Sequence, residues 1–215
     1  DDTMPTLRLL TTGAGPTRAT VAIIPDGATL GEALANPRAE AADTATDAHA
    51  EAPPTEPTAT SFSVSLSQGA VAELPIEGIA PGEYTVVVTA DEPLVGALRG
   101  SVTGPGGTDF AWFSPAGSLG DRAVVATPDA DSVVLAIANP GDADRTVTLT
   151  GPDGDAELVV PGGGSVLVEV EGRSDYSLAG MNGLRAALRA DGDGLVAQTP
   201  LQPPAPLATP VRVHV

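Results

Sequence analysis

Alternation of apolar and polar residues is the dominant pattern along this chain, and it predicts β-strands. Every second residue is apolar in SFSVSLS (61–67), in TVTLT (146–150) and, with one exception, in VLVEV (166–170). A period of two places one side of a strand on a core and the other towards solvent. Only residues 30–35 suggest helix, over one or two turns.

Turn-forming residues separate these short runs and set the expected fold class. Gly (25) and Pro (21) are frequent, and strings such as NPGD, GPDGD and VPGGG lie between the alternating segments. Each half of the chain yields seven or eight short strands. Regularly spaced strands with turn signals favour sandwiches of two antiparallel sheets. With only six aromatic residues, the core must be aliphatic.

The two halves of the chain resemble each other. Four landmarks recur: PDG at 25–27 and 152–154 (127 residues apart), Gly78 and Gly172 (94), Tyr84 and Tyr176 (92), and ALR at 97–99 and 187–189 (90). RAVVA from Arg122 also resembles the terminal VRVHV. We therefore predict an all-β protein of two tandem immunoglobulin-like antiparallel β-sandwich modules, at 1–128 and 129–215, from an internal duplication.

A single insertion explains why the spacing falls by 33 residues after the first landmark (127 minus 94). It lies in the first copy, at 28–61. Between Ala39 and Thr58 it has five acids, no base and three prolines. Such a segment has too little apolar surface to offset its ordering entropy, so we expect a mobile acidic Ala/Thr/Pro-rich loop.

The charge of the chain excludes several partners. The formal charge is −18, with ten Arg and no Lys. An acidic surface repels phosphate backbones and anionic lipid headgroups, so we expect no nucleic-acid binding. The longest apolar run, 133–138, is far below the roughly 20 residues of a membrane span, so we expect no membrane insertion by this segment. The start at Asp1 suggests a processed or excised chain, whose anchor would lie elsewhere.

Three segments carry a resemblance to a known family: VLAIANPGDADRTVTLTGPDG (134–154), VPGGGSVLVEV (160–170) and TDFAWFSPA (108–116). Together they resemble a family of actinobacterial exported or membrane-anchored proteins described only as a domain of unknown function. The resemblance implies a β-rich fold and an extracytoplasmic location, secreted or anchored by a segment absent from this chain. It supplies no catalytic residues.

The chain has no convincing catalytic constellation. Its two histidines are His49, in the acidic insertion, and His214, on the polar side of a terminal strand. No GxSxG elbow is present, and the acids in strands fall at positions expected to face solvent. Cysteine is absent, which removes thiolate chemistry. We therefore predict that this is not an enzyme.

Calcium is the one cofactor worth weighing. Aspartate pairs occur in four turns: Asp129/Asp131, Asp142/Asp144, Asp153/Asp155 and Asp191/Asp193. None follows the spacing of a helix-loop-helix calcium loop, and Asp-Gly is also the ordinary chemistry of a tight hairpin. We favour turn formation and predict no cofactor, with calcium as the alternative.

The most localised feature is the aromatic segment of Phe110, Trp112 and Phe113. Alternation places Phe110 and Trp112 on one side of a strand and Phe113 on the other. Exposed, they could stack on sugar rings or contact a partner protein. We favour the other reading, in which two fill the core and the third caps the contact between modules. The second copy has Val196 and Gln198 at the corresponding places.

These observations favour a non-catalytic extracytoplasmic structural or interaction module of the cell envelope, with a protein or an envelope glycan as partner. The alternative is a carbohydrate-binding module that uses the aromatic segment. An accessory domain of a larger enzyme is a third hypothesis. Arg99 and Arg189, which follow matching Ala-Leu pairs, are expected on the strand surface, where they could pair with acids across the sheet.

Overall fold

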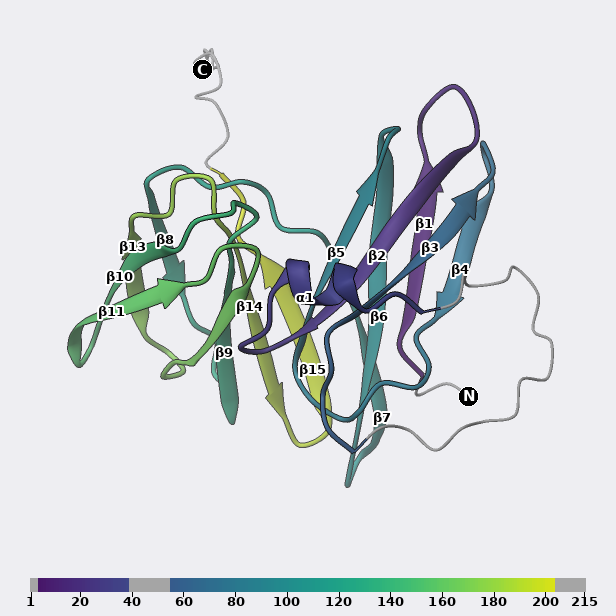
Figure 1. Ribbon diagram of the computed structural model, residues 1–215. Coiled ribbons are helices and arrows are strands. Elements are labelled where there is room, and N and C mark those ends of the chain that lie inside the picture. The colour runs from purple at the N-terminus through teal and green to yellow at the C-terminus, as the bar shows by residue number, and fades with distance from the viewer. Residues whose placement is uncertain (1–3, 39–54, 204–215) are drawn as a thin grey trace, which may run out of the picture.

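The computed structural model describes residues 4–38 and 55–203. His49, His214 and the middle of the insertion lie outside these residues. The described chain folds into two β-sandwiches, which lie side by side with one short helix, α1, between them (Figure 1). The prediction of an all-β sandwich fold is confirmed.

The first sandwich holds seven strands in two antiparallel sheets, with orders β4-β1-β6-β7 and β3-β2-β5. Their bounds are β1 Thr6–Thr11, β2 Thr17–Pro25, β3 Thr60–Leu66, β4 Val71–Pro75, β5 Tyr84–Ala90, β6 Leu94–Gly104 and β7 Gly107–Phe113. The inward positions of β1 and β2, among them Leu9, Val21 and Ile23, form a core that excludes water. The alternating segment 61–67 forms most of β3, as its pattern predicts.

The second sandwich holds eight strands, with sheet orders β11-β10-β13-β8 and β12-β9-β14-β15. Their bounds are β8 Arg122–Ala126, β9 Ser132–Ala138, β10 Arg145–Gly151, β11 Gly154–Val160, β12 Ser165–Glu169, β13 Asp175–Ala179, β14 Arg185–Gly192 and β15 Leu195–Pro200. Its core is aliphatic apart from Tyr176, with Leu135, Ile137 and Val147 fully buried.

The two sandwiches have corresponding strand orders, as the predicted duplication requires. Sheet β4-β1-β6-β7 corresponds to β12-β9-β14-β15, and β3-β2-β5 corresponds to β11-β10-β13. Gly69 and Gly163, 94 residues apart, both adopt left-handed backbone, with φ of 70° and 67°. In both copies the tyrosine hydroxyl bonds to backbone shortly upstream: Tyr84 donates to the Ala80 carbonyl, and Tyr176 accepts from the Glu171 N–H.

The immunoglobulin-like part of the prediction finds no support in these orders. In the immunoglobulin fold the first, second, fourth and fifth strands share one sheet. Here β1 pairs with β4 and β6, and β2 lies in the opposite sheet. The architecture is a sandwich, but its connectivity is different.

One strand pairs across the predicted boundary between the modules. Residues 122–126, assigned from sequence to the first copy (1–128), form β8. This strand pairs with β13 from Asp175↔Ala126 to Ala179↔Arg122, so it belongs to the second sandwich. The first sandwich has no strand beside β5 in the corresponding place among the described residues.

The segment expected to be a mobile loop (28–61) is structured at both ends. Helix α1, Leu30–Ala35, begins with a capping box in which the Thr29 hydroxyl and the Glu32 carboxylate each accept a backbone N–H of the other residue. Ala33, on the buried side of α1, packs against Ile24 of β2. The helix predicted at 30–35 is therefore confirmed, and it covers part of the outer side of sheet β3-β2-β5.

Contacts between the sandwiches join α1 and β5 to the sheet β12-β9-β14-β15. The Leu30 N–H donates to the Gly163 carbonyl (2.6 Å), and the Thr85 hydroxyl donates to the Ser165 hydroxyl (2.8 Å). The Arg189 guanidinium forms an ion pair with Glu83. The outer side of one sheet of the second sandwich is thus the surface that packs on the first.

Candidate interaction surface

The outer side of sheet β4-β1-β6-β7 presents aromatic rings to solvent. Phe110 and Trp112 lie on the outer side of β7 and are 50% and 37% exposed. Phe113 lies on the inner side, against Gly100 of β6. The alternation predicted from sequence is correct. The preference for packing two of these residues in the core is wrong for Phe110 and Trp112.

Two arginines from neighbouring strands cover these rings. The guanidinium carbon of Arg99, on β6, lies 4.5 Å from the Phe110 ring centroid, and that of Arg8, on β1, lies 4.8 Å from the Trp112 centroid. Arg8 also forms an ion pair with Glu73 of β4 (2.6 Å). Cation–π contacts of this kind hold a guanidinium over the face of an aromatic ring.

Exposed aliphatic side chains extend the surface across the sheet. Val71 of β4 and Val95 of β6 are both paired with Leu10 of β1, so all three share the outer side. Val71 is 56% and Val95 54% exposed. We call this surface the arginine–aromatic face and define it by Arg8, Val71, Glu73, Val95, Arg99, Phe110 and Trp112.

The arginine–aromatic face combines guanidinium groups with aromatic rings. Two of the ten arginines of a strongly acidic chain stand together here, beside two aromatic rings. Arginine donates to carboxylates in a planar, bidentate geometry, and aromatic rings supply apolar contact at low entropy cost. The face holds no nucleophile paired with a base.

The corresponding side of the second sandwich is already an interface. Its sheet, β12-β9-β14-β15, places Arg189 where the first sandwich has Arg99, and Val196 where the first has Phe110. Val196 is only 9% exposed, and its N–H donates to the Asp109 carboxylate of β7 (3.1 Å). The same side of the repeat is therefore covered in one copy and open in the other.

Arg189 shows how this side of the sheet makes contact. Burial alone lowers the pKa of Arg189, but hydrogen bonds and charge from Glu83 and Asp191 outweigh that effect, so the pKa is raised. Glu83 comes from the first sandwich and Asp191 from the same strand, β14. The Arg189–Glu83 pair, which sequence reasoning expected only within a sheet, joins the two modules.

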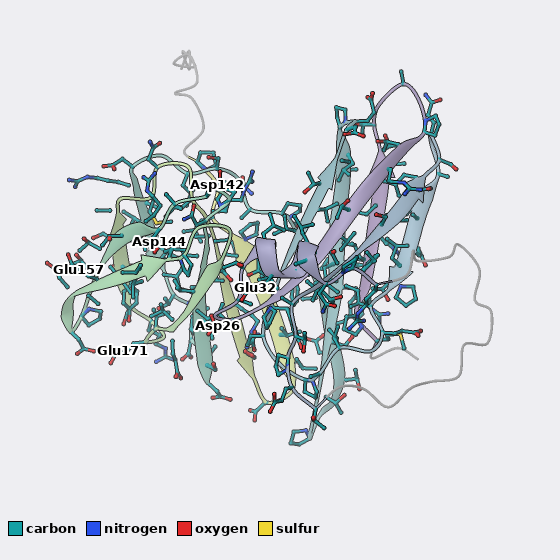
Figure 2. All side chains as sticks on the ribbon, viewed as in Figure 1. Asp26, Glu32, Asp142, Asp144, Glu157 and Glu171 are labelled. Atoms are coloured by element: carbon teal, nitrogen blue, oxygen red, sulfur yellow. The ribbon has the colours of Figure 1, made fainter. Side chains whose placement is uncertain are left out.

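The carboxylates of the acid-rich turns form hydrogen bonds and ion pairs with nearby residues of the same sandwich. The Asp144 carboxylate accepts from the Gly162 N–H (3.0 Å), and that of Asp155 accepts from the Thr150 hydroxyl (2.6 Å). Asp129 pairs with Arg173. Within 4–38 and 55–203, no three acidic or histidine side chains gather as a metal would require. In Figure 2, Glu157 and Glu171 lie on the part of the second sandwich that is away from Asp26 and Glu32 of the first.

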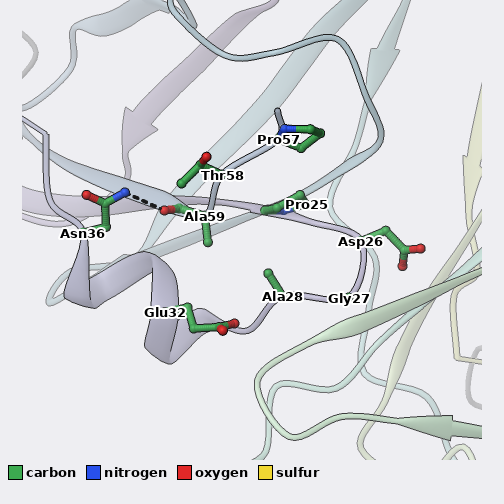
Figure 3. Close-up of a pocket in the computed structure, with 9 residues that line it drawn as sticks. All are labelled: Pro25, Asp26, Gly27, Ala28, Glu32, Asn36, Pro57, Thr58 and Ala59. Carbon is green, nitrogen blue, oxygen red and sulfur yellow. Dashed lines mark hydrogen bonds between the residues drawn. The ribbon is translucent and has the colours of Figure 1, made fainter. Parts of the chain in front are cut away.

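A shallow, open hollow lies where β2 leads into α1 (Figure 3). Asp26, Glu32 and Asn36 supply its polar groups. Glu32 caps the helix, and the Asn36 amide donates to the Ala59 carbonyl (2.9 Å), so both are committed to local structure. Asp26 points away from Asn36 in Figure 3. The hollow is therefore a junction in the fold and brings no reactive groups together.

Sequence reasoning singled out the rings and expected Arg99 on the strand surface, but it missed Arg8 and the contacts between these arginines and the rings. Arg8 lies between Leu7 and Leu9, whose alternation predicts an outward arginine but not its neighbours. Strand β1 pairs with β6 (Arg8↔Ala97, 89 residues apart), and β6 pairs with β7, so Arg8 comes to lie over Trp112. Such long-range pairing has no local signal.

The fold and this surface define a class: an all-β protein of two packed sandwiches with one exposed arginine–aromatic sheet face. The chain belongs to a family of unknown function, DUF5719, whose model matches residues 9–174. The match includes the whole arginine–aromatic face except Arg8 and ends one residue before β13. No curated protein and no solved structure matches the chain.

The predicted resemblance to a family of unknown function is confirmed at that level, and the actinobacterial origin stays a prediction. Across the described residues, no helix is long and apolar enough to cross a membrane.

Proposed function

We propose that this protein is a non-catalytic interaction module of the cell envelope, extracytoplasmic, and that the arginine–aromatic face is its contact surface. One observation supports this most. The corresponding side of the second sandwich already contacts the first sandwich, through Arg189 and Val196. A surface that serves as an interface in one copy and stands open in the other is suited to a partner.

The composition of the face supports the same proposal. Interface centres are enriched in Trp, Phe and Arg, and exposed apolar groups that gather on one sheet mark contact surfaces more often than isolated ones do. Phe110, Trp112, Val71 and Val95 are all at least 37% exposed. The actinobacterial, exported origin implied by the sequence resemblance fits such a role.

A second candidate is carbohydrate binding. Phe110 and Trp112 lie two residues apart on the same side of an edge strand, which forms a flat platform of the kind sugars stack on. Each ring also faces a guanidinium, so only its other face or edge is free for a sugar. A glycan bearing carboxylates would use both the rings and the arginines.

The test is retention of envelope components on immobilised protein. Wild type is compared with a Phe110→Ser/Trp112→Ser variant, using solubilised envelope proteins in one arm and purified envelope polysaccharides with a glycan array in the other. We expect a component that wild type retains and the double variant binds at least about tenfold more weakly. Leu34→Ser, which removes another half-exposed apolar side chain on α1, is the control and should bind as wild type does.

The two arms separate the candidates. A retained protein supports the proposed function, and a retained glycan without a protein supports the second candidate. Equal retention by wild type and by a folded double variant, as judged by circular dichroism, would contradict both.

A further inference from the structure

We propose that the open edge of β5 binds residues 211–215 of a second copy of this chain, which add to sheet β3-β2-β5 as a fourth, antiparallel strand. Residues 211–215 lie outside the described part of the chain. The proposal concerns a backbone edge and not the arginine–aromatic face, so it goes beyond the proposed function and is tested separately. It follows from one difference between the sandwiches: β8 pairs with β13 in the second, and no described strand takes the corresponding place beside β5 in the first.

Strand β5 has the features of an edge that another strand covers. Within 4–38 and 55–203, no backbone hydrogen bond joins β5 to a strand other than β2, and its hydrogen bond to the second sandwich uses the Thr85 side chain. Its sequence, YTVVVTA, has five consecutive β-branched residues and no charge or proline. Edge strands that stay exposed are usually protected from pairing by a charge, a proline or a bulge. The backbone groups of β5 that point away from β2 can therefore receive a further strand.

The core of the first sandwich is incompletely covered at this edge. Tyr84 and Val86 pack against it but stay partly exposed, whereas their counterparts Tyr176 and Leu178 are only 7% and 1% exposed. Strand β8 accounts for the difference, because two of its alternate residues pack against the second core beside β13. A strand with apolar residues at alternate positions would complete the first core in the same way.

Residues 211–215 repeat the position and the pattern of β8. Arg122 of β8 follows Arg99 by 23 residues, and Arg212 follows Arg189 by the same 23 (122 minus 99, and 212 minus 189). Strand β8 comes after the last strand of the first sandwich and pairs with the sandwich that follows. Residues 211–215 come after the last strand of the second sandwich. The same pattern pairs them with the first sandwich of another copy.

The correspondence also predicts the register. Strand β8 places Val125 opposite Tyr176. Since Val215 lies 90 residues after Val125, and Tyr84 lies 92 before Tyr176, Val215 is expected opposite Tyr84. Antiparallel pairing then sets further valines of the two strands against each other on the core side, Val213 with Val86 and Val211 with Val88. Every apolar position of the segment thus faces the incomplete core.

The charge of the segment favours contact with another copy. No acid follows Asp193 in the sequence, and residues 209–215 include one arginine, whereas the whole chain has a formal charge of −18. A basic segment is attracted to an acidic body of this kind. Because the edge and the segment differ, the contact is heterologous, and its repetition gives a ring or an open filament.

Two neighbouring substitutions test the pairing with their charge matched. Sedimentation velocity of the whole chain over a range of concentrations should show concentration-dependent association. Val213→Asp places a carboxylate against the core and should reduce the association constant by at least about tenfold. His214→Asp adds the same charge one residue later, on the outer side of the strand, and is the control that should associate as wild type does.

Disulfide cross-linking tests the partner and the register, because the chain has no cysteine of its own. Val87 and Arg212 are expected opposite each other, and opposed Cα atoms of antiparallel strands lie about 4.5–5.5 Å apart, within the span of a disulfide. A mixture of Val87→Cys and Arg212→Cys chains should therefore give a disulfide-linked pair under mild oxidation. Val87→Cys mixed with Val215→Cys, three residues out of register, is the control and should cross-link at least about tenfold less.

Three results would overturn the inference: a wild type that is monomeric at all concentrations, equal association of Val213→Asp and His214→Asp, or a mixture that forms no more disulfide than its control while the variants remain folded. A single chain carrying both Val87→Cys and Arg212→Cys that closes an internal disulfide would place the segment on its own β5 and would also exclude the second copy. None of these results changes Trp112-dependent retention of an envelope component, so the proposed function can stand when this inference fails.

Discussion

At the scale of residues, a few side chains decide whether this aliphatic protein packs correctly. Tyr176 is the one aromatic residue among the buried core of the second sandwich. Its ring lies over Gly151 at the end of β10, so closely that a Cβ at Gly151 would stand 2.2 Å from a ring carbon. Its hydroxyl accepts the Glu171 N–H at 2.8 Å. The glycine is required here by contact with the ring.

The substitution Gly151→Ala should therefore destabilise the protein. The ring must move, which strains its hydrogen bond and repacks the core, at a cost of about 1–3 kcal/mol in the free energy of unfolding. Chemical denaturation measures the change. Gly120→Ala, where no atom lies within 4 Å of the added Cβ, is the control and should be close to neutral. Equal stability of both variants would contradict this account of Gly151.

The same scale shows what alternation can and cannot predict. The pattern DFAWF correctly separated Phe110 and Trp112 from Phe113. It could not tell which side is the core, because aromatic residues are usually buried and nothing local shows that Arg8 and Arg99 lie over the rings. The guanidinium groups provide the rings with favourable partners at the surface, where packing in the core was expected.

At the scale of elements, two hairpins hold the sandwiches together. Gly104, at the end of β6, and Gly194, before β15, approach so closely that a Cβ at Gly104 would lie 2.5 Å from the Gly194 Cα. Strand β15 also donates the Val196 N–H to Asp109 of β7. The relative placement of the sandwiches therefore depends on two backbones in direct contact.

Replacing Gly104 by alanine should push these hairpins apart. The expected result is a lower melting temperature, from a loss of about 1–3 kcal/mol, together with a larger radius of gyration in small-angle X-ray scattering. Gly106→Ala, in the same turn but with its nearest neighbour 4.0 Å away, is the matched control. An unchanged radius of gyration in folded Gly104→Ala would contradict the role of this contact.

Strand β8 explains why the boundary between modules could not be placed from sequence. Repeated landmarks give the spacing between the two copies, but they do not show where one copy ends and the next begins. The resemblance of RAVVA to the terminal VRVHV assigned 122–126 to the end of the first copy, whereas strand pairing places it at the start of the second sandwich. Hydrogen-bonded pairing is a long-range property that repeat comparison does not contain.

At the scale of the whole molecule, the contact between the sandwiches covers the outer side of sheet β12-β9-β14-β15, whereas the corresponding side of the first sandwich stays open. The fold class followed from alternation and turn residues, because both are local. The interface did not, because it depends on residues as far apart as Glu83 and Arg189. What remains open is the arginine–aromatic face.

The central claim is that the arginine–aromatic face is a solvent-facing contact surface, and Trp112 allows a direct test because it is the only tryptophan. Acrylamide quenching of its fluorescence, in dilute protein, reports on Trp112 alone. We predict ready quenching in the native state, which decreases when a partner covers the face. Emission typical of a buried indole, with little quenching in dilute native protein, would contradict the account.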